Sequence, residues 1–221
     1  MKWYLDFGHG GKDPGALGTN KTKESDSVLK IGMLIKNNLE QAFEKVITTR
    51  EDDKYYSLDY RSSKANKENC DYFVSIHMNS STNKSAKGVE VWVYDEKSKL
   101  YTLSKDICTN LSKAINTPNR GVKISKNFSV LKKTKMPALL IEIDFISNTS
   151  VEASLKSDIY IKNIATSISK SLLAFVNKSI VDDGIFYRVC IGEFKDMSTA
   201  VEIKNTAISK GFNNTHIINS L

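Results

Sequence analysis

The segment PALLIEIDFI, residues 137–146, restricts the fold of this chain more than any other feature. Its apolar side chains follow one another without the alternation that marks a strand with one solvated face. The run is also far too short to span a bilayer. A continuous apolar strand of this kind is typical of the middle of a sheet that is covered on both faces. The sequence therefore predicts a layered α/β domain.

Segments with strand and helix patterns alternate along the rest of the first 178 residues. Short β-type runs predict further strands at 2–7, 46–49, 72–76 and 88–94. Apolar residues at helical spacing predict helices that start at Glu24, run from a Ser57 cap through Ala65, and span 100–114 and 161–175. We therefore expect an α/β fold whose mixed, mostly parallel twisted sheet is flanked by helices on both faces, within a domain of residues 1–178.

The last part of the chain has a different organisation. SIVDDG, residues 179–184, has the composition of a linker. A strand is expected at 186–194, a helix through 200–208 and a second strand at 215–218. Residues 179–221 thus form a linker and a small βαβ module, which is near the lower size limit for independent folding.

The chain is basic, with a net charge of +7 over 221 residues. Such an excess favours polyanions through its electric field, and both nucleic acid and an anionic cell wall are candidates on charge alone. No basic run with interleaved aromatic residues occurs, and no apolar segment reaches the length of a membrane span. We expect neither nucleic acid nor a membrane as the partner.

Two further features bear on where the protein works. The amino terminus, MKWYLDFGHGG, lacks the apolar core and cleavage site of a secretory signal. We therefore expect synthesis in the cytoplasm, and any action outside the cell requires another route of release. Cys70, Cys108 and Cys190 form no CxxC pair, which argues against a cysteine zinc site and favours reduced, partly buried thiols.

Two histidines follow strand-like runs directly. His9 lies in FGHGGKDPG after the first strand, and His77 lies in FVSIHMNSS after another. The crevice of an open α/β sheet lies at the carboxyl ends of its strands, so the two side chains can meet there if the strands are parallel neighbours. Histidine is a common zinc ligand, and a third ligand would be Cys, Asp or Glu, because His216 lies in the C-terminal module. Taken alone, two such histidines are more often structural.

The glycines around His9 could instead hold a phosphate, but neither phosphate-binding pattern fits. The Walker pattern requires a glycine five residues before Gly11-Lys12 and a Ser or Thr after it, where Asp6 and Asp13 stand. The dinucleotide pattern also fails, because Gly8 and Gly10 are followed by Asp13.

Two acids interrupt the central strand. Glu142 and Asp144 lie two residues apart and so are expected on one face of it. A charge inside an apolar strand is costly unless it pairs, binds a metal or lies at a crevice. A carboxylate near a zinc-bound water is the usual base in metal-assisted hydrolysis. The alternative for this pair is a structural salt bridge to a basic residue such as Arg61.

Five segments together resemble a known family. DFGHGGKDPGALG, KESD, YRSSKAN, FVSIHMNS and LKKTKMPALLIEIDFISN are similar, in order and spacing, to the zinc-dependent N-acetylmuramoyl-L-alanine amidases of the amidase-3 family. The resemblance covers residues 2–176. It implies that a Zn²⁺ ion is held by His9, Glu24 and His77, that Glu142 is the catalytic acid/base, and that the substrate is bacterial peptidoglycan, cleaved between N-acetylmuramic acid and L-alanine. Without it, Glu24 would be interpreted as an acid that stabilises a helix dipole.

Two departures from the family pattern affect the site. Phe7 stands where the family usually has proline, and Asp144 stands where a small or apolar residue is usual. Asp144 adds a carboxylate near Glu142, and we expect it, with Asn79, to be close enough to contact substrate. Asn79 could also orient His77 or have only a surface-loop role. The glycines around His9 are expected to keep the approach open for a bulky substrate and a metal.

The C-terminal module has its own resemblance. YRVCIGEF…A…KGF is similar to the first half of a SPOR domain, a small peptidoglycan-binding module. Half of a repeated fold predicts binding to the wall or a homodimer that supplies the missing half. Together the features favour a phage-type endolysin that acts on the wall after release. The alternatives are a bacterial autolysin, a catalytically inactive wall-binding protein on an amidase scaffold, and, on charge alone, a nucleic-acid-binding protein.

Overall fold

A computed structural model describes residues 1–180, 192–212, 215 and 217 of the chain. The chain divides into two compact units, residues 1–181 and 182–221. In the part of the chain that is described, no helix combines the length and the apolar character needed to cross a bilayer.

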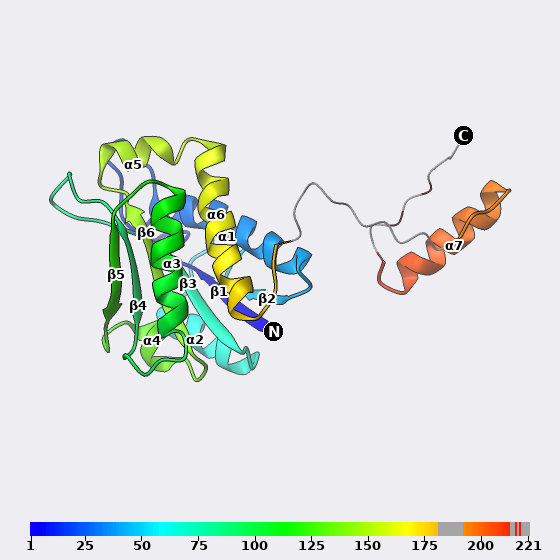
Figure 1. Ribbon diagram of the computed structural model, residues 1–221, viewed down its shortest axis with the longest axis horizontal. Coiled ribbons are helices and arrows are strands. Elements are labelled where there is room, and N and C mark those ends of the chain that lie inside the picture. The colour runs from blue at the N-terminus through cyan, green and yellow to red at the C-terminus, as the bar shows by residue number, and fades with distance from the viewer. Residues whose placement is uncertain (181–191, 213–214, 216, 218–221) are drawn as a thin grey trace. The chain divides into compact units, whose positions relative to one another are not determined.

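A six-stranded sheet forms the centre of the first unit (Figure 1). Its strands are β1 (Lys2–Phe7), β2 (Lys45–Thr48), β3 (Tyr72–Asn79), β4 (Val89–Val93), β5 (Asn119–Ile124) and β6 (Ala138–Phe145). The strand order is β2-β1-β3-β6-β4-β5. All neighbouring strands are parallel except β4 and β6, which are antiparallel. The predicted mixed, mostly parallel sheet is confirmed, and the apolar strand PALLIEIDFI supplies β6, inside the sheet.

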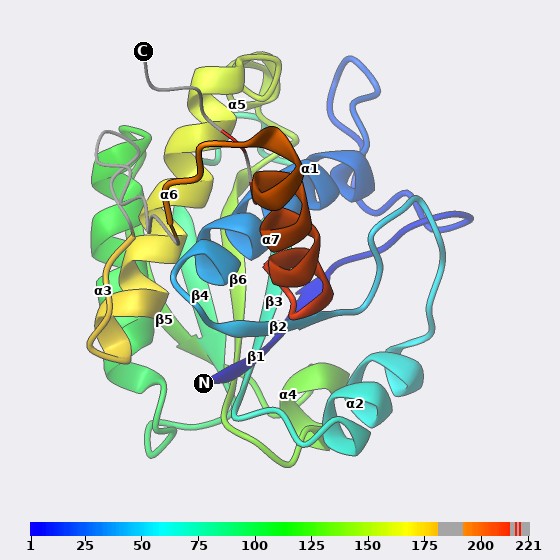
Figure 2. The ribbon, with the colours of Figure 1, turned by 90° about the vertical axis from the view of Figure 1, so that its right-hand side faces the viewer.

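Helices cover both faces of the sheet, but unequally. Three long helices, α1 (Glu24–Gln41), α3 (Tyr101–Ala114) and α6 (Asp158–Phe175), lie on one face (Figures 1 and 2). Two shorter ones, α2 (Leu58–Lys67) and α4 (Ser129–Lys133), lie on the other. A short helix, α5 (Thr149–Ser154), follows β6. The helix that follows β1 along the chain, α1, begins at Glu24.

The difference in helix length determines where polar groups can lie. Under the long helices, apolar side chains fill the strands throughout, as at Ile76 and Ile141. Under α2 and α4 the core is smaller and uses the first halves of the strands, including Tyr4, Phe73 and Leu140. Further along the same face the alternate positions are polar. They are Asp6 on β1, Ser75 and His77 on β3, and Glu142 on β6.

The second unit is described through one helix, α7 (Met197–Ser209), which confirms the helix expected there. Asp196 caps it by accepting a hydrogen bond from the backbone N–H of Thr199 at 2.8 Å. The strand expected at 186–194 lies mostly outside the described residues, and the strand expected at 215–218 lies partly outside them. Cys190 and His216 also lie outside the described residues. In the first unit, Cys70 and Cys108 are buried free thiols, as predicted.

Candidate metal and catalytic site

Three potential metal ligands converge at the carboxyl ends of β1 and β3. The ligand atoms of His9, Glu24 and His77 all lie within 4.8 Å of one another. His9 follows β1, Glu24 is the first residue of α1, and His77 lies near the end of β3. Because β1 and β3 are parallel neighbours, the two histidines end at the same edge of the sheet, as their sequence positions suggest. The structure thus brings together all three residues that the resemblance named.

Both imidazole rings meet one carboxylate oxygen. Oε1 of Glu24 lies 2.9 Å from Nδ1 of His77 and 3.2 Å from Nε2 of His9. The rings stand nearly perpendicular, with centroids 4.9 Å apart. Glu24 is 3% exposed, and its carboxylate also accepts hydrogen bonds from the backbone N–H groups of Ala16 and Met78. Two imidazoles and one carboxylate are a donor set that zinc takes at catalytic sites, where a fourth position stays open for water.

The loop after β1 orients His9. Its backbone has φ +60°, in the left-handed region that few residues with a side chain adopt. Its Nδ1 lies 2.9 Å from Oδ2 of Asp13, four residues further on. A carboxylate that accepts the Nδ1 proton leaves Nε2 free as a ligand atom. Sequence reasoning missed Asp13, although its spacing from His9 within one short loop was a usable signal.

The glycines of this loop are required by close packing. A Cβ atom on Gly8 would lie 2.3 Å from the ring of His77. One on Gly15 would lie 2.6 Å from the ring of His9 and 2.7 Å from Oε2 of Glu24. Gly10 and Gly11 would likewise collide with the backbone of Lys54 and Tyr55. These glycines allow the ligand side chains and a neighbouring loop to lie directly against the backbone, and their expected role in keeping the approach to His9 open stays a prediction.

Glu142 lies beside the ligand cluster. It is the direct partner of His77 in the β3–β6 pairing and of Glu90 in the β4–β6 pairing. We call His77, Glu142 and Glu90 the edge row, because they occupy one level of three adjacent strands. Oε2 of Glu142 is buried and accepts no hydrogen bond from any described residue. A buried polar atom without a partner is rare in native proteins and points to a functional role.

Electrostatic conditions differ between the ligands and Glu142. Burial raises the pKa of Glu142 to about 7, and the nearby charge of His77 only partly opposes this. Burial would lower the pKa of His9, but the carboxylates of Glu24 and Asp13 outweigh it and raise that pKa to about 9. Burial would raise the pKa of Glu24, but its hydrogen bonds with His77 and His9 hold that pKa well below its usual range. The cluster therefore attracts positive charge, and a metal that binds there displaces protons from the imidazoles.

The two remaining candidate residues are placed differently. Asn79 donates a hydrogen bond from Nδ2 to Oε2 of Glu90 at 3.2 Å, and no described contact joins it to His77. Asp144 is 1% exposed. Its carboxylate accepts from the backbone N–H groups of Gly88 and Phe145 and from the hydroxyl of Thr117. These contacts leave Asp144 without an exposed surface to offer a substrate.

Behind the glycine loop lies a group of buried charges that we call the scaffold cluster: Asp6, Arg50 and Arg61. Arg61 donates to Oδ1 of Asp6 at 2.7 Å and to the carbonyl oxygens of Phe7 and His9. Arg50 donates to the carbonyl oxygens of Phe7 and Gly8 and of Ser25 in α1. The salt bridge between Arg61 and Glu142 or Asp144, considered from the sequence, is thus wrong, because Asp6 is the partner.

A second anchor holds the loop that leads into α1. Glu152 in α5 is fully buried, and its carboxylate accepts from the backbone N–H groups of Asn20 and Thr22. Gly18 packs so tightly against this carboxylate that a Cβ would lie 2.3 Å from it. This contact joins residues 130 or more positions apart, so no local sequence signal could reveal it. It fixes the approach of the chain to Glu24.

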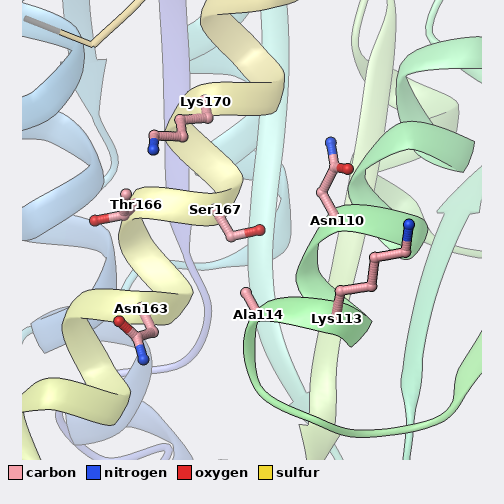
Figure 3. A pocket seen from close by; sticks show the side chains of 7 residues that line it. All are labelled: Asn110, Lys113, Ala114, Asn163, Thr166, Ser167 and Lys170. Atoms are coloured by element: carbon pink, nitrogen blue, oxygen red, sulfur yellow. The ribbon is translucent and has the colours of Figure 1, made fainter.

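The candidate residues take no part in a groove of about 600 Å³ between α3 and α6 (Figure 3). Asn110, Lys113 and Ala114 of α3 line it, with Asn163, Thr166, Ser167 and Lys170 of α6. The chemistry-bearing groups of the first unit gather instead at the sheet edge.

Comparison with known proteins agrees with this arrangement. Residues 4–174 match the family described as N-acetylmuramoyl-L-alanine amidase (Amidase_3). The sporulation-specific N-acetylmuramoyl-L-alanine amidase of Bacillus subtilis is 34% identical over 215 residues, which cover 96% of this chain and 82% of that protein. An endolysin of Bacillus phage SPP1 is 35% identical over 181 residues, covering 79% and 65%. The structure of N-acetylmuramoyl-L-alanine amidase AmiC2 of Nostoc punctiforme aligns with a TM-score of 0.75 at 32% identity, covering 80% of this chain and 97% of that one.

Proposed function

The chain belongs to the N-acetylmuramoyl-L-alanine amidase family, and we propose that it hydrolyses peptidoglycan with a Zn²⁺ ion held by His9, Glu24 and His77 and with Glu142 as the acid/base. The bond cleaved joins the lactyl carbonyl of N-acetylmuramic acid to L-alanine. One observation carries the proposal. Three ligand atoms suited to zinc lie within 4.8 Å of one another, beside Glu142, whose Oε2 is buried and accepts no hydrogen bond from a described residue.

The roles of the side chains follow from their surroundings. When bound, zinc polarises a carbonyl and lowers the pKa of water to about 7. Glu142, with its own pKa raised to about 7 by burial, is suited to accept a proton from the attacking water near neutral pH. It then delivers that proton to the leaving amine of L-alanine. Asp13 and the scaffold cluster hold His9 and the loop in place.

Metal removal is the experiment that tests this proposal. Lysis of purified cell walls, followed as turbidity loss, should stop after chelation and return when zinc is added. His77→Ala should lose both bound zinc and activity, because each ligand is needed for affinity. Lys170→Ala, a change in the groove between α3 and α6, is the matched control and should retain both. Lysis that persists after exhaustive metal removal, verified by elemental analysis, would contradict the zinc assignment, and walls left intact by the zinc-loaded protein would favour an inactive wall-binding scaffold.

Its biological setting has two candidates. The similar phage endolysin favours the lytic-phage interpretation that the sequence suggested. The bacterial sporulation-specific amidase aligns over 96% of this chain, so that alignment also includes most of the second unit. We therefore propose a bacterial wall amidase as the second candidate. Induction of the transcript during sporulation or during phage lysis distinguishes the two.

The second unit is proposed to bind the wall or to join two chains. Val201 and Ile208 of α7 are both more than a third exposed, and a unit this small gains stability if such side chains are covered. Sedimentation of the full chain beside residues 1–178 measures this. Dimerisation of the full chain alone supports an assembly role, and a full chain that stays monomeric at tens of micromolar excludes the dimer.

A further inference from the structure

The edge row continues onto a fourth strand. His77, Glu142 and Glu90 pair directly across β3, β6 and β4. On the next strand, β5, Arg120 lies at the irregularity between the Val89–Asn119 and Val91–Val122 pairs. Its Nε donates to Oε1 of Glu90 at 2.5 Å. A guanidinium group therefore stands at the end of a line of functional groups that begins at the metal ligands.

The side chain of Arg120 is held by more than this ion pair. Its aliphatic part lies so close to Gly88 that a Cβ there would be 2.7 Å from both Cγ and Cδ. Its guanidinium carbon lies 5.0 Å from the centre of the Phe145 ring. Gly88 has φ +123°, a conformation that suits glycine, so the backbone itself makes room for the arginine. The guanidinium is thus oriented before any ligand arrives.

Arg120 nevertheless retains unused donors. A guanidinium has five N–H groups, and Nε accounts for one of them. Its two terminal nitrogens donate to no other described residue, and the side chain is 43% exposed. Glu90 is 5% exposed, and each of its oxygens already has a partner: Oε1 accepts from Nε of Arg120 and Oε2 from Nδ2 of Asn79. The planar end of an oriented arginine matches a carboxylate through two parallel hydrogen bonds.

We propose that Arg120 binds a free carboxylate of the peptidoglycan stem peptide, on the leaving-group side of the scissile bond. This inference rests on the proposed function. The muramic acid carboxyl is consumed in the scissile amide, so the free carboxylates of the substrate lie in the peptide. Neighbouring strands are about 4.8 Å apart, which puts the guanidinium about 5–10 Å from the strand of Glu142. Two to three residues of extended peptide span this distance, at about 3.4 Å each.

A pair of synthetic substrates tests the proposal. Both are N-acetylmuramoyl-L-Ala-γ-D-Glu-L-Lys amides, and they differ only in whether the α-carboxyl of the D-glutamyl residue is free or amidated. In Arg120→Gln, kcat/KM for the free-acid substrate should fall roughly 10- to 100-fold, as expected for loss of a charge-assisted hydrogen bond. Its kcat/KM for the amidated substrate should stay near that of the unmodified chain. Lys123→Gln removes the same charge from the same strand and should preserve the preference.

The measurements also separate a binding role from a structural one. Zinc content and thermal stability are recorded for each variant, and Arg120→Lys, which keeps the charge but loses the planar fork, should give an intermediate preference. Equal losses on both substrates, or no loss on either, would overturn the role of Arg120 while leaving the proposed function intact. Failure of the zinc-loaded unmodified chain to cleave either substrate would instead refute the proposed function and this inference with it.

Discussion

The scaffold cluster and the edge row both place carboxylates on the same face of one sheet, but Asp6 in the first and Glu142 in the second differ in their hydrogen-bond partners. Asp6 is 1% exposed, and its two oxygens accept hydrogen bonds from Arg61, Thr49 and Ser75 at 2.6–2.7 Å. Glu142 keeps one buried oxygen without a partner among the described residues. The carboxylate of Asp6 is thus fully paired, and that of Glu142 is not.

Burial alone would raise the pKa of both acids. In Asp6 the guanidinium of Arg61 and two hydroxyl groups overcome that effect, and the pKa is lowered. In Glu142 burial prevails and raises the pKa to about 7. A carboxylate that is fully paired serves as a structural anchor, whereas one that titrates near neutrality can exchange protons with substrate. The partners of a buried acid, more than its burial, thus distinguish structure from chemistry in this molecule.

The largest expected effect is a loss of turnover when Glu142 in the edge row is replaced. Glu142→Gln should lower kcat by roughly 10²–10⁴, the usual contribution of a positioned acid/base, while bound zinc is retained. The change keeps the shape of the side chain but removes its ability to accept a proton. Steady-state kinetics on purified walls and metal analysis of the same samples measure both quantities. If bound zinc and activity are lost together, Glu142 helps to hold the metal and is not the base.

Replacing a residue of the scaffold cluster should lower the stability of the fold. Arg61→Met leaves Asp6 buried without its cationic partner, which typically costs about 3–5 kcal/mol of unfolding free energy. It also removes donors from the carbonyl groups of Phe7 and His9, so the loop that carries His9 should loosen. Urea unfolding measures the loss. The matched control is Lys133→Met, which breaks the exposed pair with Asp59 and should cost about 0–1 kcal/mol.

Asp144 provides a further test of this comparison between Asp6 and Glu142. It lies on the same strand as Glu142, but its carboxylate accepts hydrogen bonds from several partners, as that of Asp6 does. Asp144→Asn should destabilise the fold by about 1–3 kcal/mol, since a charged acceptor for Gly88 and Thr117 is lost. Its kcat should change little beside that of Glu142→Gln. If Asp144→Asn instead causes the larger loss of kcat at unchanged stability, Asp144 is the acid/base and the comparison is reversed.

The smallest effects concern pH and have opposite signs in the two regions. The pKa of Asp6 lies below its ordinary value of 3.8 in the folded chain, so the unfolded chain takes up a proton first as pH falls. The stability that Asp6 contributes is therefore present above 3.8 and is lost as pH falls through the folded pKa. The pKa of Glu142 is raised from 4.5 to about 7, so the metal-free fold loses stability as pH rises across that interval.

Urea unfolding of metal-free protein from pH 3 to pH 8 tests both signs. Asp6→Asn should flatten the acid side of the stability curve, and Glu142→Gln should remove a decline between pH 4.5 and 7. Curves that stay parallel to that of the unmodified chain in both variants would show that neither acid is linked to folding in this way.

Much of the fold could be predicted because its signals are local. Continuous apolar character identified β6, and helical spacing identified α1, α3 and α6, since each pattern records which face of an element meets the core. Strand β5 was missed because NRGVKI is polar and carries a glycine, and α4 because a five-residue helix shows no period. At the site, His9 and His77 followed from their places after strands, whereas Glu24 came only from resemblance, because a first-turn acid is ordinary in any helix.

The sequence by itself determined most of the strands and helices, their order along the chain and the residue types at the strand ends, because these depend on the periodicity of neighbouring residues. Only the tertiary structure decided which charges are satisfied. Arg61 selects Asp6 across 55 positions, Glu152 holds a loop 130 positions away, and the glycines prove to be sites of contact. Sequence carries residue identity at each position but not the distances between positions far apart in the chain. The energy of a buried charge depends on its partners within a few ångströms, and packing of the whole domain determines those partners.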